Sequence, residues 1–146
     1  MPGSFGENLA SVGLTEDQVC IGDVFTLGTA TVHISQGRQP CWKLNAHIGD
    51  DRMAWRSQKM GRTGWYYRVL STGTVQTGDV IALADRPNPT WTVQRVTAAR
   101  LTRRVDAADA AELSTLPELA QGWREAFLRM SEGDKTENTT TRLQAP

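Results

Sequence analysis

A single cysteine with cationic neighbours is the most chemically suggestive feature of this sequence. Cys41 lies in the stretch HISQGRQPCWKLNAH, with Arg38 three residues before it and Lys43 two residues after it. Cationic neighbours stabilise a thiolate and so favour nucleophilic chemistry or metal binding. Gly37 can present backbone N–H groups to an anion, and Arg38 can bind a phosphate or carboxylate with two donors. From the residues alone, a reactive thiolate beside an anion site and an ordinary packing cysteine are equally supported.

The remaining cysteine and the histidines offer fewer possibilities. Cys20, in QVCIGD, lies between apolar residues, and we interpret it as a packing residue. The chain has two cysteines and two histidines without short paired spacings, so we expect no four-ligand zinc site. A hydrolase in which His47 acts as the base for Cys41 remains an alternative. His33 falls on the outward face of its predicted strand and is interpreted as solvated.

A second candidate cluster is aromatic and basic. The segment GRTGWYYRV brings Arg62 and Trp65 into one turn and strand, where they could stack on a flat heterocycle and bind its anionic end. The alternative is that the aromatic residues fill the core. We favour a pocket role for Arg62 and Trp65 and a core role for Tyr67.

Most of the elements that would position these residues are predicted strands. Alternation of apolar and polar residues predicts a β-hairpin over residues 24–35, with its turn at Gly28-Thr29 and one solvated face. WYYRVL (65–70) and VIALA (80–84) predict two further strands. Between them, residues 50–61 predict a short helix that begins at Asp50 or Asp51 and ends at Gly61.

After the proline-rich segment DRPNPTW (85–91) the pattern becomes helical, which predicts a domain boundary there. Three short helices follow, one of them capped by Asp106, and they are too small to be stable unless they pack on the strands or on a partner. The last predicted helix has an apolar stripe formed by Leu119, Trp123, Phe127 and Met130. Residues 132–146 are polar and predict a disordered tail.

Composition limits the classes of partner. The formal net charge is zero and the pI is about 6.7, so no overall charge attracts nucleic acid or a membrane surface. No segment approaches the roughly 18 consecutive apolar residues of a membrane helix. Two cysteines and no secretory leader favour a cytoplasmic protein without a disulfide framework.

Taken together, several segments resemble the MOSC domain, the module named after the C-terminal part of molybdenum cofactor sulfurases. They are FGENL (5–9), GL (13–14), IGDVF (21–25), ISQGRQPCWKLN (34–45), GRTGWYYRVL (61–70) and GDVI (78–81). Within that family they are most similar to YiiM-type proteins associated with resistance to 6-N-hydroxylaminopurine. The resemblance implies a mainly β fold: part of a MOSC β-barrel over residues 1–86, a small α-helical extension of three helices over 91–131, and the tail.

The resemblance also implies a function. The molybdenum cofactor (molybdopterin) would bind with Cys41 as catalytic sulfur carrier or metal ligand, and with Arg38, Lys43 and Asn8 around it. Arg62 and Trp65 would complete the cofactor pocket. The implied reaction reduces a small N-hydroxylated substrate to an amine, with electrons from a separate reductase.

The beginning of the chain leads to one further expectation. YiiM-type proteins have a section with strands before FGENL, whereas this sequence begins almost at that motif. We therefore expect a MOSC domain that is N-terminally truncated relative to the family, with strand edges that another chain would cover. The alternative function is a non-catalytic remnant that serves as a binding or dimerisation module, with a second copy of this chain as the candidate partner in a homodimer.

Overall fold

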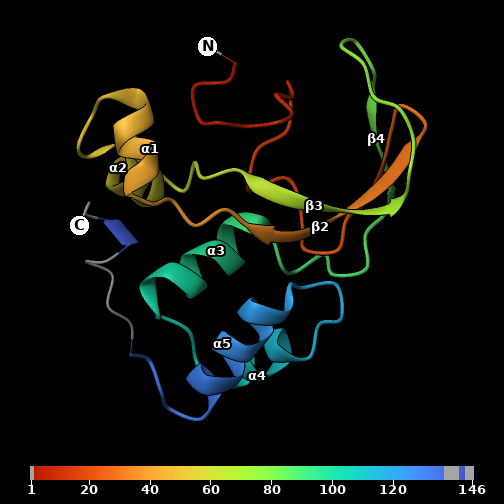
Figure 1. Ribbon diagram of the computed structural model, residues 1–146. Helices are drawn as coiled ribbons and strands as arrows, with labels where there is room; N and C mark the ends of the chain where they lie inside the picture. The colour runs from red at the N-terminus through yellow and green to blue at the C-terminus, as the bar shows by residue number, and fades with distance from the viewer. Residues whose placement is uncertain (1, 137–141, 144–146) are drawn as a thin grey trace.

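The computed structural model describes residues 2–136, 142 and 143, and it contains both strands and helices (Figure 1). In chain order the elements are β1 (Val24–Leu27), β2 (Ala30–Gly37), α1 (Trp42–Ile48), α2 (Met53–Met60), β3 (Trp65–Ser71), β4 (Ile81–Asp85), α3 (Val93–Thr102), α4 (Ala107–Ser114) and α5 (Gln121–Ser131).

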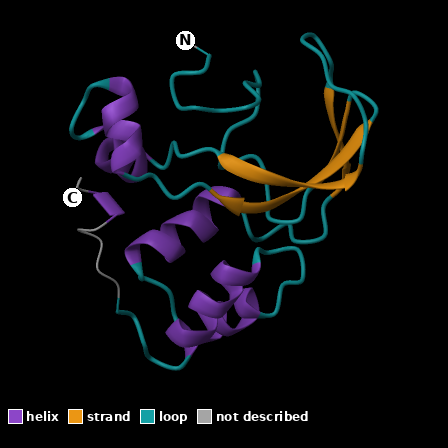
Figure 2. Cartoon of the chain, in the orientation of Figure 1, coloured by secondary structure: helices purple, strands orange, loops and turns teal. Residues whose placement is uncertain are grey.

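The four strands form one antiparallel sheet in the order β3-β2-β1-β4. The predicted hairpin is confirmed, and its turn uses Gly28 at a φ of 57°, a conformation that glycine adopts readily. The resemblance implied part of a β-barrel, and the described strands do not close into one. Closing a barrel requires the two edge strands to meet, and β3 and β4 lie at opposite edges of an open sheet (Figure 2). The fold is therefore a mixture of sheet and helices, not mainly β.

Two helices, α1 and α2, connect β2 to β3. The sequence predicted only the second, and Gly61 in the left-handed conformation ends it as expected. The predicted cap at Asp50 or Asp51 is wrong, because Arg52 is the N-cap of α2 and makes no side-chain cap bond. The Asp50 carboxylate instead accepts a hydrogen bond from the Arg52 amide at 2.9 Å and stabilises the turn before the helix.

The three predicted C-terminal helices are confirmed as α3, α4 and α5. The Asp106 side chain caps α4 by accepting a hydrogen bond from the Asp109 amide at 2.8 Å. The apolar stripe of the last helix is buried as predicted. Figure 1 shows α3 next to the sheet, with α4 and α5 beyond it.

The sheet and the C-terminal helices share one hydrophobic core. Members from the strand region, including Phe25 and Ile34, join members from the helices, including Val96 and Phe127. Trp91, at the end of the predicted boundary segment, also belongs to this core. The backbone at Trp91 and just after it pairs with the first part of the chain: the Ile21 amide donates to the Trp91 carbonyl, and the Val93 amide donates to the Val19 carbonyl, each at 2.9 Å. Cys20 is buried, as predicted.

The hairpin does not have the solvated face that its alternation predicted. On β2, His33 and Ser35 are each only 8% exposed. The segment before α5 lies close to this second face: Glu118 interacts electrostatically with His33, and the Ala120 amide donates a hydrogen bond to the Ser35 carbonyl at 2.9 Å. The prediction of a solvated His33 is therefore wrong, and burial lowers the pKa of its imidazole.

The outer strands of the sheet expose apolar side chains. Val69 and Leu70 of β3 and Leu83 of β4 are each about half exposed, at 58%, 51% and 48%. No helix among the described residues is long and apolar enough to cross a membrane.

Candidate active site

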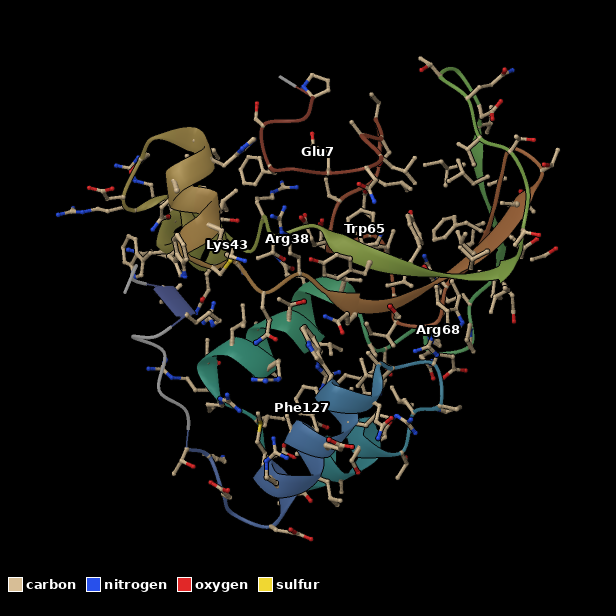
Figure 3. The ribbon with its side chains drawn as sticks, in the orientation of Figure 1. Glu7, Arg38, Lys43, Trp65, Arg68 and Phe127 are labelled. Atoms are coloured by element: carbon tan, nitrogen blue, oxygen red, sulfur yellow. The ribbon has the colours of Figure 1, made fainter. Side chains whose placement is uncertain are left out.

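Arg38 lies directly after β2, at the end of the β2–β3 ladder. Gly37 pairs with Trp65, and the Arg38 amide donates to the Gly64 carbonyl at 2.9 Å. The Arg38 guanidinium donates to the carbonyl of Phe5. The ladder therefore places Arg38 between Trp65 and the N-terminal segment, as Figure 3 shows.

Glu7 organises the N-terminal segment, although no role was predicted for this residue from the sequence. Its carboxylate accepts hydrogen bonds from the amides of Gly3 and Phe5, the latter at 2.9 Å. A hydrogen bond from its own amide, followed by those from Gly3 and Phe5, lowers the pKa of Glu7, with a smaller contribution from the Arg38 charge. A glutamate that directly follows a glycine within the FGENL motif is the signal that could have identified it. Asn8, the neighbouring predicted site residue, is exposed.

Cys41 is the N-cap of α1. Its backbone is extended, with φ −137° and ψ 172°, and its carbonyl accepts a hydrogen bond from the Leu44 amide at 2.9 Å. The thiol is free and half-buried, whereas the preceding residue, Pro40, is fully buried. Lys43, in the first turn of α1, is exposed. The structure thus presents Cys41 and Lys43 from one turn, with Arg38 just before it.

His47 lies at the other end of α1 and points to a different partner. Its Nε2 lies 3.3 Å from the Gly3 carbonyl oxygen. Six residues of helix separate it from Cys41, which corresponds to a rise of about 9 Å and a rotation of about 240°. This geometry does not favour His47 as a base for the thiol, and failure of an ester probe to label Cys41 would argue further against a hydrolase.

Arg62 and Trp65 are not brought together. Arg62 is exposed, and its guanidinium lies 3.4 Å from the Glu16 carboxylate. Trp65 is half-buried, lies against the hydrophobic core and meets the Tyr67 ring edge-on at a centroid distance of 6.4 Å. Tyr67 also packs against the core, in agreement with the sequence interpretation. Of the two predicted pocket residues, only Trp65 lies next to Arg38.

The α1–α2 hairpin that supports Cys41 is held by a residue that the sequence did not identify. Asn45 is only 9% exposed, and its Oδ1 accepts a hydrogen bond from the Ala54 amide at 2.7 Å. Its Nδ2 donates to the Asp51 carbonyl at 2.9 Å. The side chain of Asn45 thereby joins α1, the connecting turn and α2.

A separate groove of about 570 Å³ lies between α2 and α3. Trp55 and Met60 of α2 and Leu101 of α3 contribute to its lining. None of the six predicted site residues is among the lining residues, so this groove is distinct from the Cys41 region.

Two family models match the chain. Residues 1–82 match the MOSC domain, and residues 91–132 match the YiiM-like, 3-alpha helix domain. The chain belongs to the MOSC family. The helical region after Trp91 is its YiiM-like extension, as the resemblance implied.

Relatives of this MOSC chain agree with that assignment. It is 34% identical over 140 residues to Protein YiiM of Escherichia coli, covering 96% of this chain and 62% of that protein. It is 40% identical over 116 residues to a protein named Reductase from Gibberella moniliformis, covering 79% of this chain but 21% of that protein. The crystal structure of YiiM from Geobacillus stearothermophilus superposes with a TM-score of 0.86 at 34% identity, covering 90% of this chain and 67% of that chain. The chain therefore spans only part of each relative's length.

The donor set around Cys41 can be compared with the cofactor that the family implies. Among the described residues there is no group of three or more His, Cys, Asp or Glu side chains that could hold a metal ion. Cys41 offers one soft sulfur ligand, and Arg38 and Lys43 offer cations for an anionic group. This set fits a metal that its own organic ligand already holds, with the protein adding one sulfur.

Proposed function

We propose that this MOSC domain binds the molybdenum cofactor at the Cys41 turn and reduces N-hydroxylated compounds to amines. One observation carries the proposal: a half-buried, free thiol begins α1 in the same turn as Lys43 and three residues after Arg38. Membership of the MOSC family supports it, as does the name Reductase of the Gibberella relative.

Each residue near the turn has a distinct part in this proposal. Cys41 supplies the sulfur ligand, and Lys43 and Arg38 bind the phosphate or the pterin edge of the cofactor. Arg38 has five N–H donors, so its bond to the Phe5 carbonyl leaves donors for an anion. Trp65 forms the apolar wall beside Arg38 and Asn8 lines the outer rim, while Arg62, which pairs with Glu16, is left outside the pocket.

The reaction consumes two electrons and two protons for each substrate. The N–O bond of the N-hydroxylated compound breaks, the nitrogen is released as an amine and the oxygen leaves as water. The bound cofactor supplies the redox-active molybdenum that makes this transfer possible. We propose that a separate reductase supplies the electrons. The two cysteines form no disulfide, which favours a reducing compartment such as the cytoplasm.

The test measures metal and pterin in the purified protein. The chain is produced in a host that makes molybdopterin, as wild type, Cys41→Ser and Cys20→Ser, and molybdenum and pterin are quantified per chain. We expect both in the wild type, much less molybdenum in Cys41→Ser, and wild-type content in folded Cys20→Ser. Equal and near-zero metal in all three proteins would remove this proposal.

A second candidate is a non-catalytic module that associates with a copy of itself. The half-exposed apolar residues of β3 and β4 favour this candidate, because open sheet edges readily pair with other chains. Sedimentation at several protein concentrations tests it. A monomer at all concentrations, with bound molybdenum, would leave the reductase as the better proposal.

A further inference from the structure

The last described residues of the chain lie against the α1–α2 hairpin. The Arg142 guanidinium donates to the Pro40 carbonyl at 2.5 Å through Nη1 and to Gln58 Oε1 at 2.9 Å through Nη2. Leu143 contributes its carbonyl, which accepts a hydrogen bond from Asn45 Nδ2 at 3.3 Å. These contacts join residues 84 to 102 positions apart in the sequence.

One of these contacts is made to the residue directly before Cys41. Pro40 is fully buried and directly precedes Cys41, so its carbonyl belongs to the peptide bond that enters the cysteine. Gln58 lies on α2, the second helix of the hairpin. A single guanidinium therefore bridges the Cys41 turn and α2, and a charge-assisted bond to a carbonyl is stronger than a neutral one.

Asn45 connects the C-terminal residues to the α1–α2 turn. The side-chain amide that holds the α1–α2 turn through Asp51 also reaches the Leu143 carbonyl. Arg142 and Leu143 thus contact both ends of the hairpin: the turn before α1 and the junction with α2. Arg142 and Leu143 are themselves half-buried in this arrangement.

We propose that Arg142 is a positioning residue that clamps the Cys41 turn onto α2 from the C-terminal segment. When the clamp is in place, the backbone at the start of α1 is fixed and the thiol has one orientation. When it is released, the first turn of α1 opens. This inference goes beyond the proposed function, and it does not require that the cofactor be bound.

Amide hydrogen exchange in the full chain without cofactor tests the clamp. For Arg142→Ala we expect the amides of residues 42–48 to exchange about tenfold faster, because charge-assisted bonds of this kind oppose local opening. Arg142→Lys retains one charged donor and should restore part of the protection. Arg104→Ala removes an exposed arginine of the segment between α3 and α4 and should leave residues 42–48 unchanged.

Thiol alkylation provides a second readout within the same proteins. Cys41 should be modified faster in Arg142→Ala, while Cys20, which is 2% exposed, reports on global unfolding. The proposal is overturned if residues 42–48 exchange at the wild-type rate in Arg142→Ala. It is also overturned if α5 and Cys20 respond as strongly as α1 and Cys41, because the effect would then be global.

Discussion

The guanidinium of Arg86 binds the fully buried carboxylate of Asp23 through two parallel hydrogen bonds. Nε donates to Oδ1 at 2.9 Å, and Nη2 donates to Oδ2 at 2.7 Å. Asp23 is 0% exposed, and it also accepts a hydrogen bond from the Cys20 amide at 2.9 Å. This pair connects the start of β1 to the segment after β4, and it raises the pKa of Arg86 chiefly through these hydrogen bonds.

Removing Arg86 should strongly destabilise the fold. Arg86→Ala leaves the Asp23 carboxylate buried without its partner, and loss of one member of a buried pair costs about 3 kcal/mol of unfolding free energy or more. Urea unfolding measures the effect. Arg56→Ala, which breaks the exposed pair with Asp50, is the matched control and should change stability by less than about 1 kcal/mol. An equal loss of unfolding free energy in the two variants would show that the buried Asp23 pair stabilises the fold no more than the exposed pair does.

Asn45→Ala should destabilise the α1–α2 hairpin. It leaves the buried Ala54 amide and the Asp51 carbonyl without their partners, at a cost of about 2 kcal/mol. Asn45→Asp keeps an acceptor for Ala54 and should cost less. The exposed Asn8→Ala provides the control and should remain within about 0.5 kcal/mol of the wild type. Chemical denaturation measures all three variants, and a neutral Asn45→Ala would refute the role of Asn45 in the hairpin.

Gly37→Ala should disturb the contact between β2 and α3. A Cβ at this position would lie 1.9 Å from Thr97 Oγ1, so the buried Thr97 side chain or the helix that carries it must shift, at a cost of about 2 kcal/mol. Adding Thr97→Ala removes that oxygen and should recover part of the loss. Gly122→Ala, in open space on α5, should instead stabilise by about 0.5 kcal/mol. Thermal unfolding distinguishes these outcomes, and a Gly37→Ala variant as stable as the wild type would contradict the close approach.

His33 should make stability depend on pH just below neutrality. Burial and the Arg68 charge lower the pKa of His33 from its ordinary 6.5, while Glu118 opposes the shift. Because the unfolded chain then binds the proton more readily, stability is complete above pH 6.5 and falls as the pH drops. The slope for one proton is at most about 1.4 kcal/mol per pH unit. Urea unfolding between pH 7.5 and 5.5 measures it. The slope of unfolding free energy against pH should shrink in His33→Gln and persist in His47→Gln. An unchanged slope in His33→Gln would show that another group causes the pH dependence.

The sequence predicted the strands and the C-terminal helices well because each has a clear local signal. Alternation marked the β1–β2 hairpin, and the stripe through Trp123 and Phe127 marked the last helix. The open sheet could not be foreseen, because strand order depends on pairing between distant segments. The burial of His33 was missed for the same reason. The face of β2 on which it lies is close to a segment about 85 residues later in the chain, near Ala120.

The candidate site was only partly accessible to sequence reasoning. Arg38, Cys41 and Lys43 are close in sequence, so their proximity followed directly. The helix α1 was missed because seven residues with Leu44 and Asn45 as the buried ones give little periodicity. The roles of Glu7 and Arg142 depend on contacts with Arg38 and Pro40 that only the folded chain creates.

The core that the sheet shares with the C-terminal helices has a consequence for how the chain unfolds. Phe25 and Ile34 contribute to the same apolar interior as Val96 and Phe127, with Trp91 between them. Neither family module can lose its structure without exposing the interior of the other. Heating should therefore melt the two together, in a single cooperative transition, despite their separate positions along the sequence.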